Sequence, residues 1–330
     1  MTASFDATAR PGGSTRGGRE SLRDVLVDAE QRLARAGVPS PSYDAAALAA
    51  HVIGVPRLRL RLQDRLGDAE RVRLEQLLIA RAARVPLQHL LGVAAFRRIE
   101  LRVGAGVFIP RPETELVAET ALRLLPVGGV AVDLGTGSGA LALSLAVERR
   151  DVVVHAVERD PAAMAWARRN VAELAGDLTV SGSQVQLHQA DATTAADPGG
   201  PLSGLCGRVD VVVSNPPYIP DHAVPRDPEV RDHDPAAALY GGPDGLDTVR
   251  GIARTAALLL PAGGSFVLEH GDEQGEAAKL SGVPGLLRAM VVDDELALAQ
   301  HGLPGQPVWS RVVDRADLNR RPRFTVATRA

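Results

Sequence analysis

The sequence has a single cysteine, Cys206, and this scarcity limits what the protein can be. One cysteine cannot form an intramolecular disulfide, and a lone loop cysteine fits a protein of the reducing cytoplasm. The eight histidines form neither an H-x-x-x-H pair nor a cluster with the cysteine, which argues against a metal site. No uncharged apolar run reaches the length of a transmembrane helix, so we expect no membrane association.

Strong positive charge is also missing. The net charge is −3, and no dense Lys/Arg run is present, so the sequence argues against a protein held mainly by nucleic acid phosphates. Residues 1–20 are rich in Gly, Ser, Thr and Arg and have no apolar segment of the kind found in secretion signals, so we expect a disordered extension. A length of 330 residues, 45% of them hydrophobic, suffices for two domains.

The most informative segment is Asn215-Pro216-Pro217-Tyr218. It follows the apolar run 209–213, which is typical of a buried parallel strand. The two prolines restrict the backbone, so the Asn215 side chain is expected to be held rigidly at the carboxyl edge of a sheet, where open α/β folds bind ligands. A neutral amide beside an aromatic ring suits a planar amino or amide nitrogen as substrate. The structural alternative is a strand end that prolines terminate.

A glycine-rich turn precedes this segment by about eighty residues. The apolar run 130–134 leads into Gly135, Gly137 and Gly139, and a helical pattern follows over 141–147. Glycines let the backbone approach a ligand, and a helix N-terminus offers free N–H groups to it. The turn alone also satisfies the dinucleotide pattern G-x-G-x-x-A, and Glu158 would bind ribose hydroxyls in NAD or in S-adenosylmethionine. The Asn-Pro-Pro-Tyr segment favours S-adenosylmethionine.

Two further segments narrow the family. Residues 84–92 read Arg-Val-Pro-Leu-Gln-His-Leu-Leu-Gly, with Phe96 shortly after, and residues 108–116 read Phe-Ile-Pro-Arg-Pro-Glu-Thr-Glu-Leu. With the glycine turn and Asn-Pro-Pro-Tyr, the chain from about residue 21 to 330 resembles the release factor glutamine methyltransferases of the PrmC/HemK type. These are class I S-adenosylmethionine-dependent enzymes.

The pattern of apolar residues agrees with the two-domain organisation of that family. Helical spacing is found over 21–36, 44–53, 68–83 and 113–125. Strands are expected over 130–134, 152–158, 184–189, 209–214, 264–269, 308–313 and 323–328. The alternation of strands with helices predicts an α/β fold with a doubly wound, mostly parallel sheet, in which the last two strands form an antiparallel edge.

The resemblance implies a seven-stranded methyltransferase sheet and a small N-terminal helical domain. The expected domains are the extension over 1–20, a helical substrate-docking domain over 21–92, a hairpin linker over 93–112 and a methyltransferase domain over 113–330. The sequence alone leaves open whether the helical domain docks the substrate or closes over the site, and we favour docking.

The resemblance also assigns site residues. It implies that the cofactor is bound by Phe108, Asp133, Gly135, Thr136, Gly137, Gly139, Glu158, Asp191 and Asn215. Asn215, Pro216 and Tyr218 are expected to be catalytic, and Pro217 and Arg111 to bind the substrate with them. The family usually has large apolar residues after the acidic residue at position 191, whereas this chain has Ala192 and Thr193.

Structural alternatives exist for several of these residues. Asp133 could serve only to cap the glycine turn, Glu158 and Asp191 could be solvated carboxylates at strand ends, and Arg111 could anchor the joint between the domains.

Three functions are compatible with these features. The first is methylation of the side-chain amide nitrogen (N5) of the glutamine in the Gly-Gly-Gln loop of peptide chain release factors, by a cytoplasmic monomer that binds no nucleic acid. The alternative is an adenine N6 amino methyltransferase acting on DNA or RNA, because a similar motif binds flipped bases. The third is a protein that binds S-adenosylmethionine and a partner without turnover.

Overall fold

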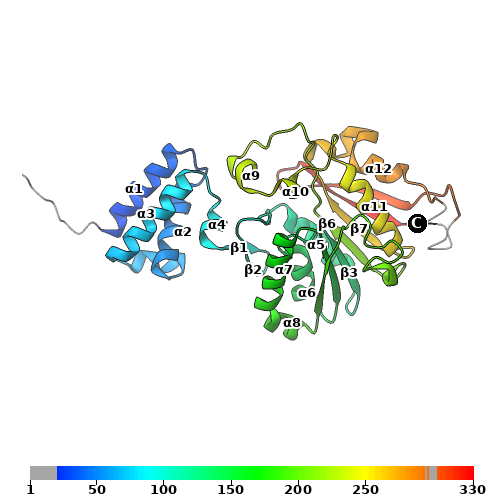
Figure 1. Cartoon of the computed structure of the whole chain (residues 1–330), viewed down its shortest axis with the longest axis horizontal. Coiled ribbons are helices and arrows are strands. Elements are labelled where there is room, and N and C mark those ends of the chain that lie inside the picture. Colours follow the sequence, from blue (N-terminus) through cyan, green and yellow to red (C-terminus); the bar gives the residue numbers. More distant parts are fainter. Residues whose placement is uncertain (1–20, 294–295, 297–302) are drawn as a thin grey trace, which may run out of the picture. The chain divides into compact units, whose positions relative to one another are not determined.

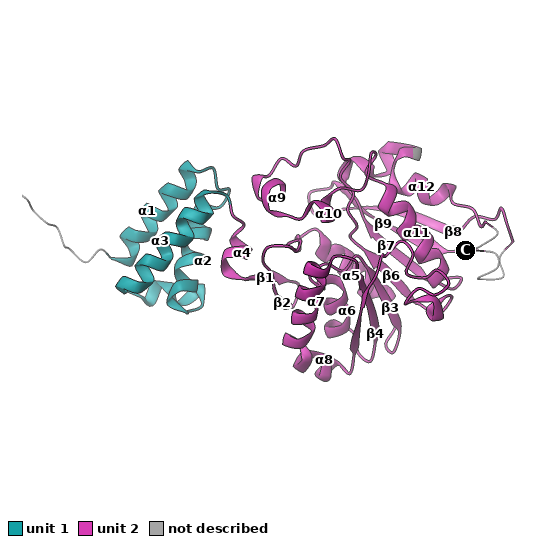
Figure 2. Ribbon diagram, in the orientation of Figure 1, with its two compact units in different colours: residues 1–84 teal, residues 85–330 magenta. Residues whose placement is uncertain are grey.

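The computed structural model describes residues 21–293, 296 and 303–330. The chain forms two compact units, one that ends at Arg84 and one that begins at Val85 (Figure 2).

The first unit is helical. It contains α1 (Leu22–Arg35), α2 (Pro41–Ile53), the 3-10 helix η1 (Arg57–Leu62) and α3 (Asp68–Ala82), so the three helices predicted here are confirmed. Helix α2 begins three residues earlier than the apolar pattern indicated, because Pro41 occupies its first turn, where proline is favoured. Apolar faces of the helices form the interior, and a buried ion pair of 2.7 Å joins Arg81 Nε to Asp44 Oδ2.

The second unit opens with short elements that lead into the sheet. Helix α4 (Leu87–Leu91) precedes an antiparallel hairpin of β1 (Val93–Phe96) and β2 (Ile99–Arg102), and α5 (Thr114–Leu124) follows. The sequence predicted a hairpin in this region and a helix over 113–125. The segment between β2 and α5 has no regular structure, and it carries Phe108 and Arg111.

The predicted seven-stranded, mostly parallel sheet is confirmed. Its strands in chain order are β3 (Val130–Leu134), β4 (Val153–Glu158), β5 (Gln184–Gln189), β6 (Val211–Ser214), β7 (Ser265–Glu269), β8 (Trp309–Ala316) and β9 (Pro322–Arg329). The order across the sheet is β5-β4-β3-β6-β7-β9-β8, and only the pairings of β9 with β7 and β8 are antiparallel. The last strand is therefore an internal one.

Helices cover both faces of the sheet, as Figure 1 shows. One face packs against α5, α6 (Ala140–Glu148), α7 (Pro161–Glu173) and α8 (Ala175–Ser181). The other packs against α11 (Asp247–Leu259) and α12 (Val283–Ala289). Successive residues of β6 alternate between the two cores, since Val211 and Val213 join the first and Val212 joins the second.

The remaining elements are short. They are η2 (Ser203–Leu205), α9 (Pro228–His233), α10 (Ala236–Leu239), η3 (Asp272–Gln274) and η4 (Glu276–Ser281). None of the helices in the described part of the chain is both long enough and apolar enough to cross a membrane.

The strand order determines where a ligand can bind. Strand β3 pairs with β4 on one side and with β6 on the other, so the chain direction across the sheet switches at β3. Ligands of doubly wound folds bind at such a switch point, beyond the carboxyl ends of the strands. The Ser214 hydroxyl donates to the Leu134 carbonyl oxygen at 2.6 Å and ties the ends of β6 and β3 together. The glycine turn and Asn-Pro-Pro-Tyr, separated by about eighty residues in sequence, are thereby brought to one place.

Candidate functional site

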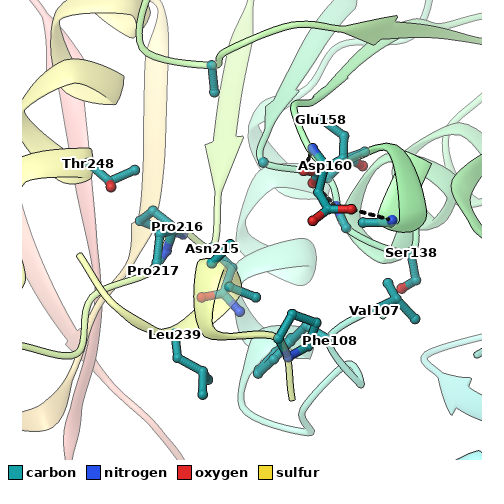
Figure 3. Close-up of a pocket in the computed structure, with 18 of the residues that line it drawn as sticks. Val107, Phe108, Ser138, Glu158, Asp160, Asn215, Pro216, Pro217, Leu239 and Thr248 are labelled. Atoms are coloured by element: carbon teal, nitrogen blue, oxygen red, sulfur yellow. Dashed lines mark hydrogen bonds between the residues drawn. The ribbon is translucent and has the colours of Figure 1, made fainter. Parts of the chain in front are cut away.

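A pocket lies at this switch point, beyond the carboxyl ends of β3, β4, β5 and β6. Figure 3 shows Glu158 and Asp160 in one part of it and Asn215, Pro216 and Pro217 in another. Eleven of the thirteen site residues predicted from the sequence line it: Phe108, Arg111, Gly135, Thr136, Gly137, Glu158, Asp191, Asn215, Pro216, Pro217 and Tyr218.

The glycine turn between β3 and α6 leaves room for a ligand. Gly135 and Gly137 have φ of 82° and 57°, values that residues with a side chain rarely adopt. A Cβ added to either would meet no described atom within 4 Å, so their backbone borders open space. Glycine is needed here for backbone conformation, and the result is a turn that a ligand can approach closely.

Asp133 and Gly139 do not line the pocket in the described structure. Asp133 is fully buried, and its Oδ2 accepts hydrogen bonds from the Thr136 hydroxyl at 2.5 Å and from Ala142 N at 3.1 Å. This is the capping role that the sequence analysis gave as the alternative. Gly139 has φ of 89°, and a Cβ there would lie 3.0 Å from Leu143. Both residues shape the turn from behind.

Asp133 has an unusual environment. Its Oδ1 has no hydrogen-bond partner among the described residues, and burial raises the pKa of this carboxyl to about 7 despite the bonds to its other oxygen. The turn is thus built on a buried acid whose charge is poorly compensated.

Glu158 ends β4 and is fixed by the turn itself. Its Oε2 accepts from Gly137 N at 2.9 Å, and its Oε1 accepts from Asp160 N at 2.8 Å. Asp160 caps the N-terminus of α7 and also lines the pocket. Each carboxylate oxygen of Glu158 keeps further acceptor capacity, so hydroxyl groups of a ribose can bind it in this orientation.

Asp191 and its neighbours form a third part of the wall. Burial alone would raise the pKa of Asp191, but hydrogen bonds from the Thr193 hydroxyl and backbone N, together with Arg159, hold it below the ordinary value. Ala192 and Thr193, where the family usually has larger residues, line the pocket too. Helix α11 adds Thr248 and Ile252 to this wall, and the sequence analysis did not identify either.

Asn215 follows β6 directly and is partly buried in the pocket wall. Its Nδ2 donates to the hydroxyl oxygen of Thr114 at 3.3 Å. The amide nitrogen is therefore engaged with the first residue of α5, which leaves the carbonyl oxygen Oδ1 as the acceptor of this side chain.

The turn after Asn215 is supported from outside the pocket. Gln274 Nε2 donates to the carbonyl oxygen of Tyr218 at 2.9 Å, and Gln274 Oε1 accepts from Gly271 N at 3.0 Å. A Cβ on Gly245 would lie 2.3 Å from the Tyr218 carbonyl oxygen, so only glycine fits there. Both close contacts restrict the position of Tyr218.

Charged side chains are buried behind this turn. Burial together with nearby Glu269 raises the pKa of Tyr218, and Arg323 of β9 acts in the opposite direction. Glu269, at the end of β7, is 1% exposed, and burial raises its pKa to about 7. The Thr114 hydroxyl and the Arg323 charge act against this rise, and Glu269 Oε2 has no hydrogen-bond partner among the described residues. Sequence reasoning gave none of Thr114, Glu269 and Arg323 a role.

Arg111 contacts protein groups on both sides. It forms an ion pair of 2.5 Å with the buried carboxylate of Asp234, and its guanidinium lies 4.8 Å from the centre of the Phe108 ring. Asp234 precedes α10, whose residues line the pocket with Val230 and Pro235. Arg111 therefore holds the segment around α9 and α10 against the pocket, and a direct contact of Arg111 with substrate remains a prediction.

Family comparisons agree with this site. The model described as "PrmC N-terminal domain" matches residues 24–92, and the one described as "Methyltransferase small domain" matches residues 113–227. A release factor glutamine methyltransferase of Streptomyces coelicolor is 44% identical over 314 residues, covering 92% of this chain and 97% of the relative. The chain belongs to the release factor glutamine methyltransferase family.

Other members of the family are similarly close. The relative from Mycolicibacterium smegmatis is 45% identical over 309 residues, with 93% of this chain and 98% of the relative covered. The relative from Deinococcus radiodurans is 41% identical over 254 residues, which is 75% of this chain and 85% of the relative.

S-adenosylmethionine is the cofactor of this methyltransferase, and the pocket has suitable chemistry for it. The open backbone of the glycine turn, the carboxylates of Glu158, Asp160 and Asp191 and the aromatic ring of Phe108 surround one space. Such a set fits a ligand that combines an adenine base, a ribose and a positively charged centre. Glu158 would hold the ribose, and Asp191 and Phe108 would lie along the nucleoside.

Proposed function

We propose that this methyltransferase modifies the side-chain amide nitrogen of the glutamine in the Gly-Gly-Gln loop of peptide chain release factors. The observation that carries the proposal is the Asn215 amide, whose nitrogen is bound by Thr114 so that its carbonyl oxygen is the acceptor at the pocket. The names of the relatives favour glutamine over the adenine alternative.

The chemistry requires positioning more than acid or base. Bound S-adenosylmethionine supplies an electrophilic methyl group. A glutamine nitrogen is a poor nucleophile, because its lone pair is delocalised into the carbonyl as in a peptide bond. Oδ1 of Asn215 and the carbonyl oxygen of Pro216 would accept its two N–H groups, turn the nitrogen toward the methyl group and stabilise the positive charge that develops.

Tyr218 serves as a wall for the planar amide. Because burial raises its pKa, its hydroxyl stays neutral and does not act as a base. No base is needed before the transfer, since the methylated nitrogen can lose its extra proton to solvent.

The test uses purified protein with S-adenosylmethionine that carries a labelled methyl group. A release factor should be labelled, and a factor with Gln→Asn in the Gly-Gly-Gln loop should not. DNA and RNA with accessible adenines are included in parallel. Equal labelling of both factors, or labelling of nucleic acid on equal terms with protein, would defeat the proposal.

We also propose that the helical unit docks the release factor. In its 3-10 helix η1, leucines alternate with arginines, and Leu58 and Leu62 are 81% and 70% exposed. Exposed aliphatic side chains of this kind are typical of a binding surface. Such contacts orient a loop glutamine that offers little area of its own.

The double variant Leu58→Ser/Leu62→Ser should raise KM for the release factor about tenfold, roughly 1.4 kcal/mol of lost binding, while kcat and cofactor affinity stay unchanged. Val180→Ser, which replaces an 84% exposed aliphatic side chain on α8 by the same polar residue, is the control. An equal rise of KM in both proteins would contradict docking at η1.

A monomer in the cytoplasm, without bound nucleic acid or membrane, completes the proposal. Methyl transfer per protein chain should then be independent of enzyme concentration, and sedimentation over the same concentrations should detect no self-association.

A further inference from the structure

The hydrogen bonds behind Asn215 form a chain that reaches a buried carboxylate. Asn215 Nδ2 donates to the Thr114 hydroxyl oxygen at 3.3 Å, and the Thr114 hydroxyl lowers the pKa of the neighbouring Glu269 carboxyl, which is the effect of a hydroxyl that donates toward a carboxylate. Thr114 is 3% exposed and Glu269 is 1% exposed, so water does not compete strongly for these groups. The three residues come from the turn after β6, from the start of α5 and from the end of β7.

A hydroxyl has one proton, and this fact fixes the direction of the hydrogen bonds between Asn215, Thr114 and Glu269. Because the ionised Glu269 carboxylate can only accept, the Thr114 proton must point toward it. The Thr114 oxygen can then only accept from Asn215, which requires that the amide present its NH₂ to Thr114. Its oxygen consequently faces the pocket. With the amide turned over, NH₂ would meet the N–H groups of a substrate amide, and neither side could accept.

We propose that Thr114 and Glu269 are positioning residues that fix the orientation of the Asn215 amide, so that its oxygen rather than its nitrogen meets the substrate. The proposal rests on the proposed function for the identity of the substrate, but the orientation of the amide is a property of the protein alone. Arg323 contributes by its charge, which favours the ionised form of Glu269.

One substitution tests the contact of Asn215 with Thr114, and another tests the contact of Thr114 with Glu269. Thr114→Val keeps the shape and removes the hydroxyl, and Thr114→Ser keeps the hydroxyl. In Glu269→Gln the oxygen of the new amide should face the cationic Arg323, so its NH₂ would face Thr114 and turn the Thr114 proton toward Asn215. Thr114→Val and Glu269→Gln should each lower kcat for release factor methylation about tenfold, the factor that one ordinary hydrogen bond can set. Thr114→Ser should stay within about threefold of wild type, and cofactor affinity should be unchanged in all three.

The double variant Thr114→Val/Glu269→Gln separates orientation from simple loss of packing. It also removes the buried charge that Thr114→Val leaves without its donor, so it keeps the test valid if that single variant folds poorly. If the two residues act through one chain, the double variant should lose no more activity than either single variant. Independent structural damage would instead add, giving a loss of about a hundredfold.

The pH profile is a further measure. Burial raises the pKa of Glu269 to about 7 against the effects of Thr114, Arg323 and Arg111, Glu113 adds to the rise, and Tyr218 also interacts with this carboxyl. Ionised Glu269 is the form that orients the Thr114 hydroxyl and the Asn215 amide, so wild-type kcat should rise with pH through about 7. In Glu269→Gln this rise should be absent.

A spectroscopic experiment tests the orientation without turnover. The sequence has only three asparagines, Asn170, Asn215 and Asn319, so selective ¹⁵N labelling gives three side-chain NH₂ groups. The buried Asn170 donates through Nδ2 to two backbone carbonyls, and Asn319 is exposed, so the two side chains mark slow and fast hydrogen exchange. The Asn215 NH₂ should exchange slowly in wild type and at least about tenfold faster in Thr114→Val, as expected for a lost hydrogen bond.

Unchanged Asn215 exchange in Thr114→Val, or kcat within about twofold of wild type in both single variants, would overturn the proposal. If wild-type enzyme labels no release factor, the proposed function fails, and the exchange measurement still decides the orientation of the amide by itself.

Discussion

The glycine turn after β3 and the Asn-Pro-Pro-Tyr turn after β6 lie at neighbouring strand ends, yet they obtain their shapes in different ways. The glycine turn is shaped by local contacts, since Asp133 bonds to Thr136 and Ala142, which are three and nine residues away. The Asn-Pro-Pro-Tyr turn depends on distant contacts, since Asn215 bonds to Thr114, 101 residues away, and the Tyr218 carbonyl to Gln274, 56 residues away.

The difference matches the demands of the two ligands. A cofactor with many polar groups can be held by a local turn, because several contacts share the task of orienting it. The reacting nitrogen of the substrate is oriented by very few groups, so each must be fixed by the surrounding protein. Substitutions in the glycine turn should therefore affect cofactor binding, and substitutions in the Asn-Pro-Pro-Tyr turn should affect the reaction of the substrate.

The largest expected effect concerns the buried acid of the glycine turn. The folded state holds the Asp133 proton up to about pH 7, whereas the unfolded chain releases it near 3.8. The folded state thus binds more protons between these values, and the free energy of unfolding should fall as pH rises from about 4 to about 7. This contribution amounts to at most about 4 kcal/mol.

Asp133→Asn should remove the part of that fall that Asp133 contributes, while Glu269, whose pKa burial also raises to about 7, should still contribute its own part. Denaturant melts at pH 5 and pH 8 measure the fall, and Asp177→Asn, on the exposed side of α8, is the control. The same pH dependence in Asp133→Asn and wild type would contradict the assignment.

Asn215→Ala should affect only the part of the pocket that binds the substrate glutamine. Loss of a preorganised group that stabilises developing charge lowers kcat by about 10²–10³. Cofactor affinity, measured by calorimetry, should stay within about threefold of wild type, because the glycine turn and Glu158 are untouched. Asn319→Ala, which alters an exposed asparagine, should leave both values unchanged. A parallel loss of cofactor binding in Asn215→Ala would mean that the cofactor part and the substrate part of the pocket do not act independently.

Gly135→Ala should show the reverse pattern. The left-handed conformation at φ of 82° costs a residue with a side chain about 1–2 kcal/mol, so the turn should be distorted. We expect weaker cofactor binding with little change in kcat at saturating cofactor. Gly176→Ala in α8 introduces the same methyl group at negative φ and should be neutral or stabilising. Calorimetry and thermal melts on the two variants provide the comparison.

Local signals in the sequence predicted most of the fold. The seven strands were predicted within three residues at each end, because buried apolar runs and turn residues mark them clearly. Eleven of the predicted site residues line the pocket. The glycines, prolines and strand-end carboxylates among them are identifiable from neighbouring residues, whereas Phe108 and Arg111 were assigned by the resemblance to the family.

The residues behind the site could not be predicted in the same way. Thr114 looks like an ordinary residue in the first turn of a helix, and Glu269 looks like a solvated strand end. Their roles arise only when β7 and α5 pack beside β6, which depends on sheet order. For Asp133 the sequence predicted the position in the glycine turn. Its burial away from the pocket follows from the packing of α6, which the local sequence does not show.

The internal position of β9 has a consequence for the order of folding. β9 follows β7 and β8 in the sequence but lies between them, and it carries Arg323. Until β9 is inserted, β7 has an unpaired edge, and the buried groups behind Tyr218 are incomplete. The parallel strands β3 and β4, which are close in sequence, can form earlier because their loop closure costs less entropy. A folding intermediate that already contains the glycine turn would therefore capture the methyl donor before it could accept a glutamine.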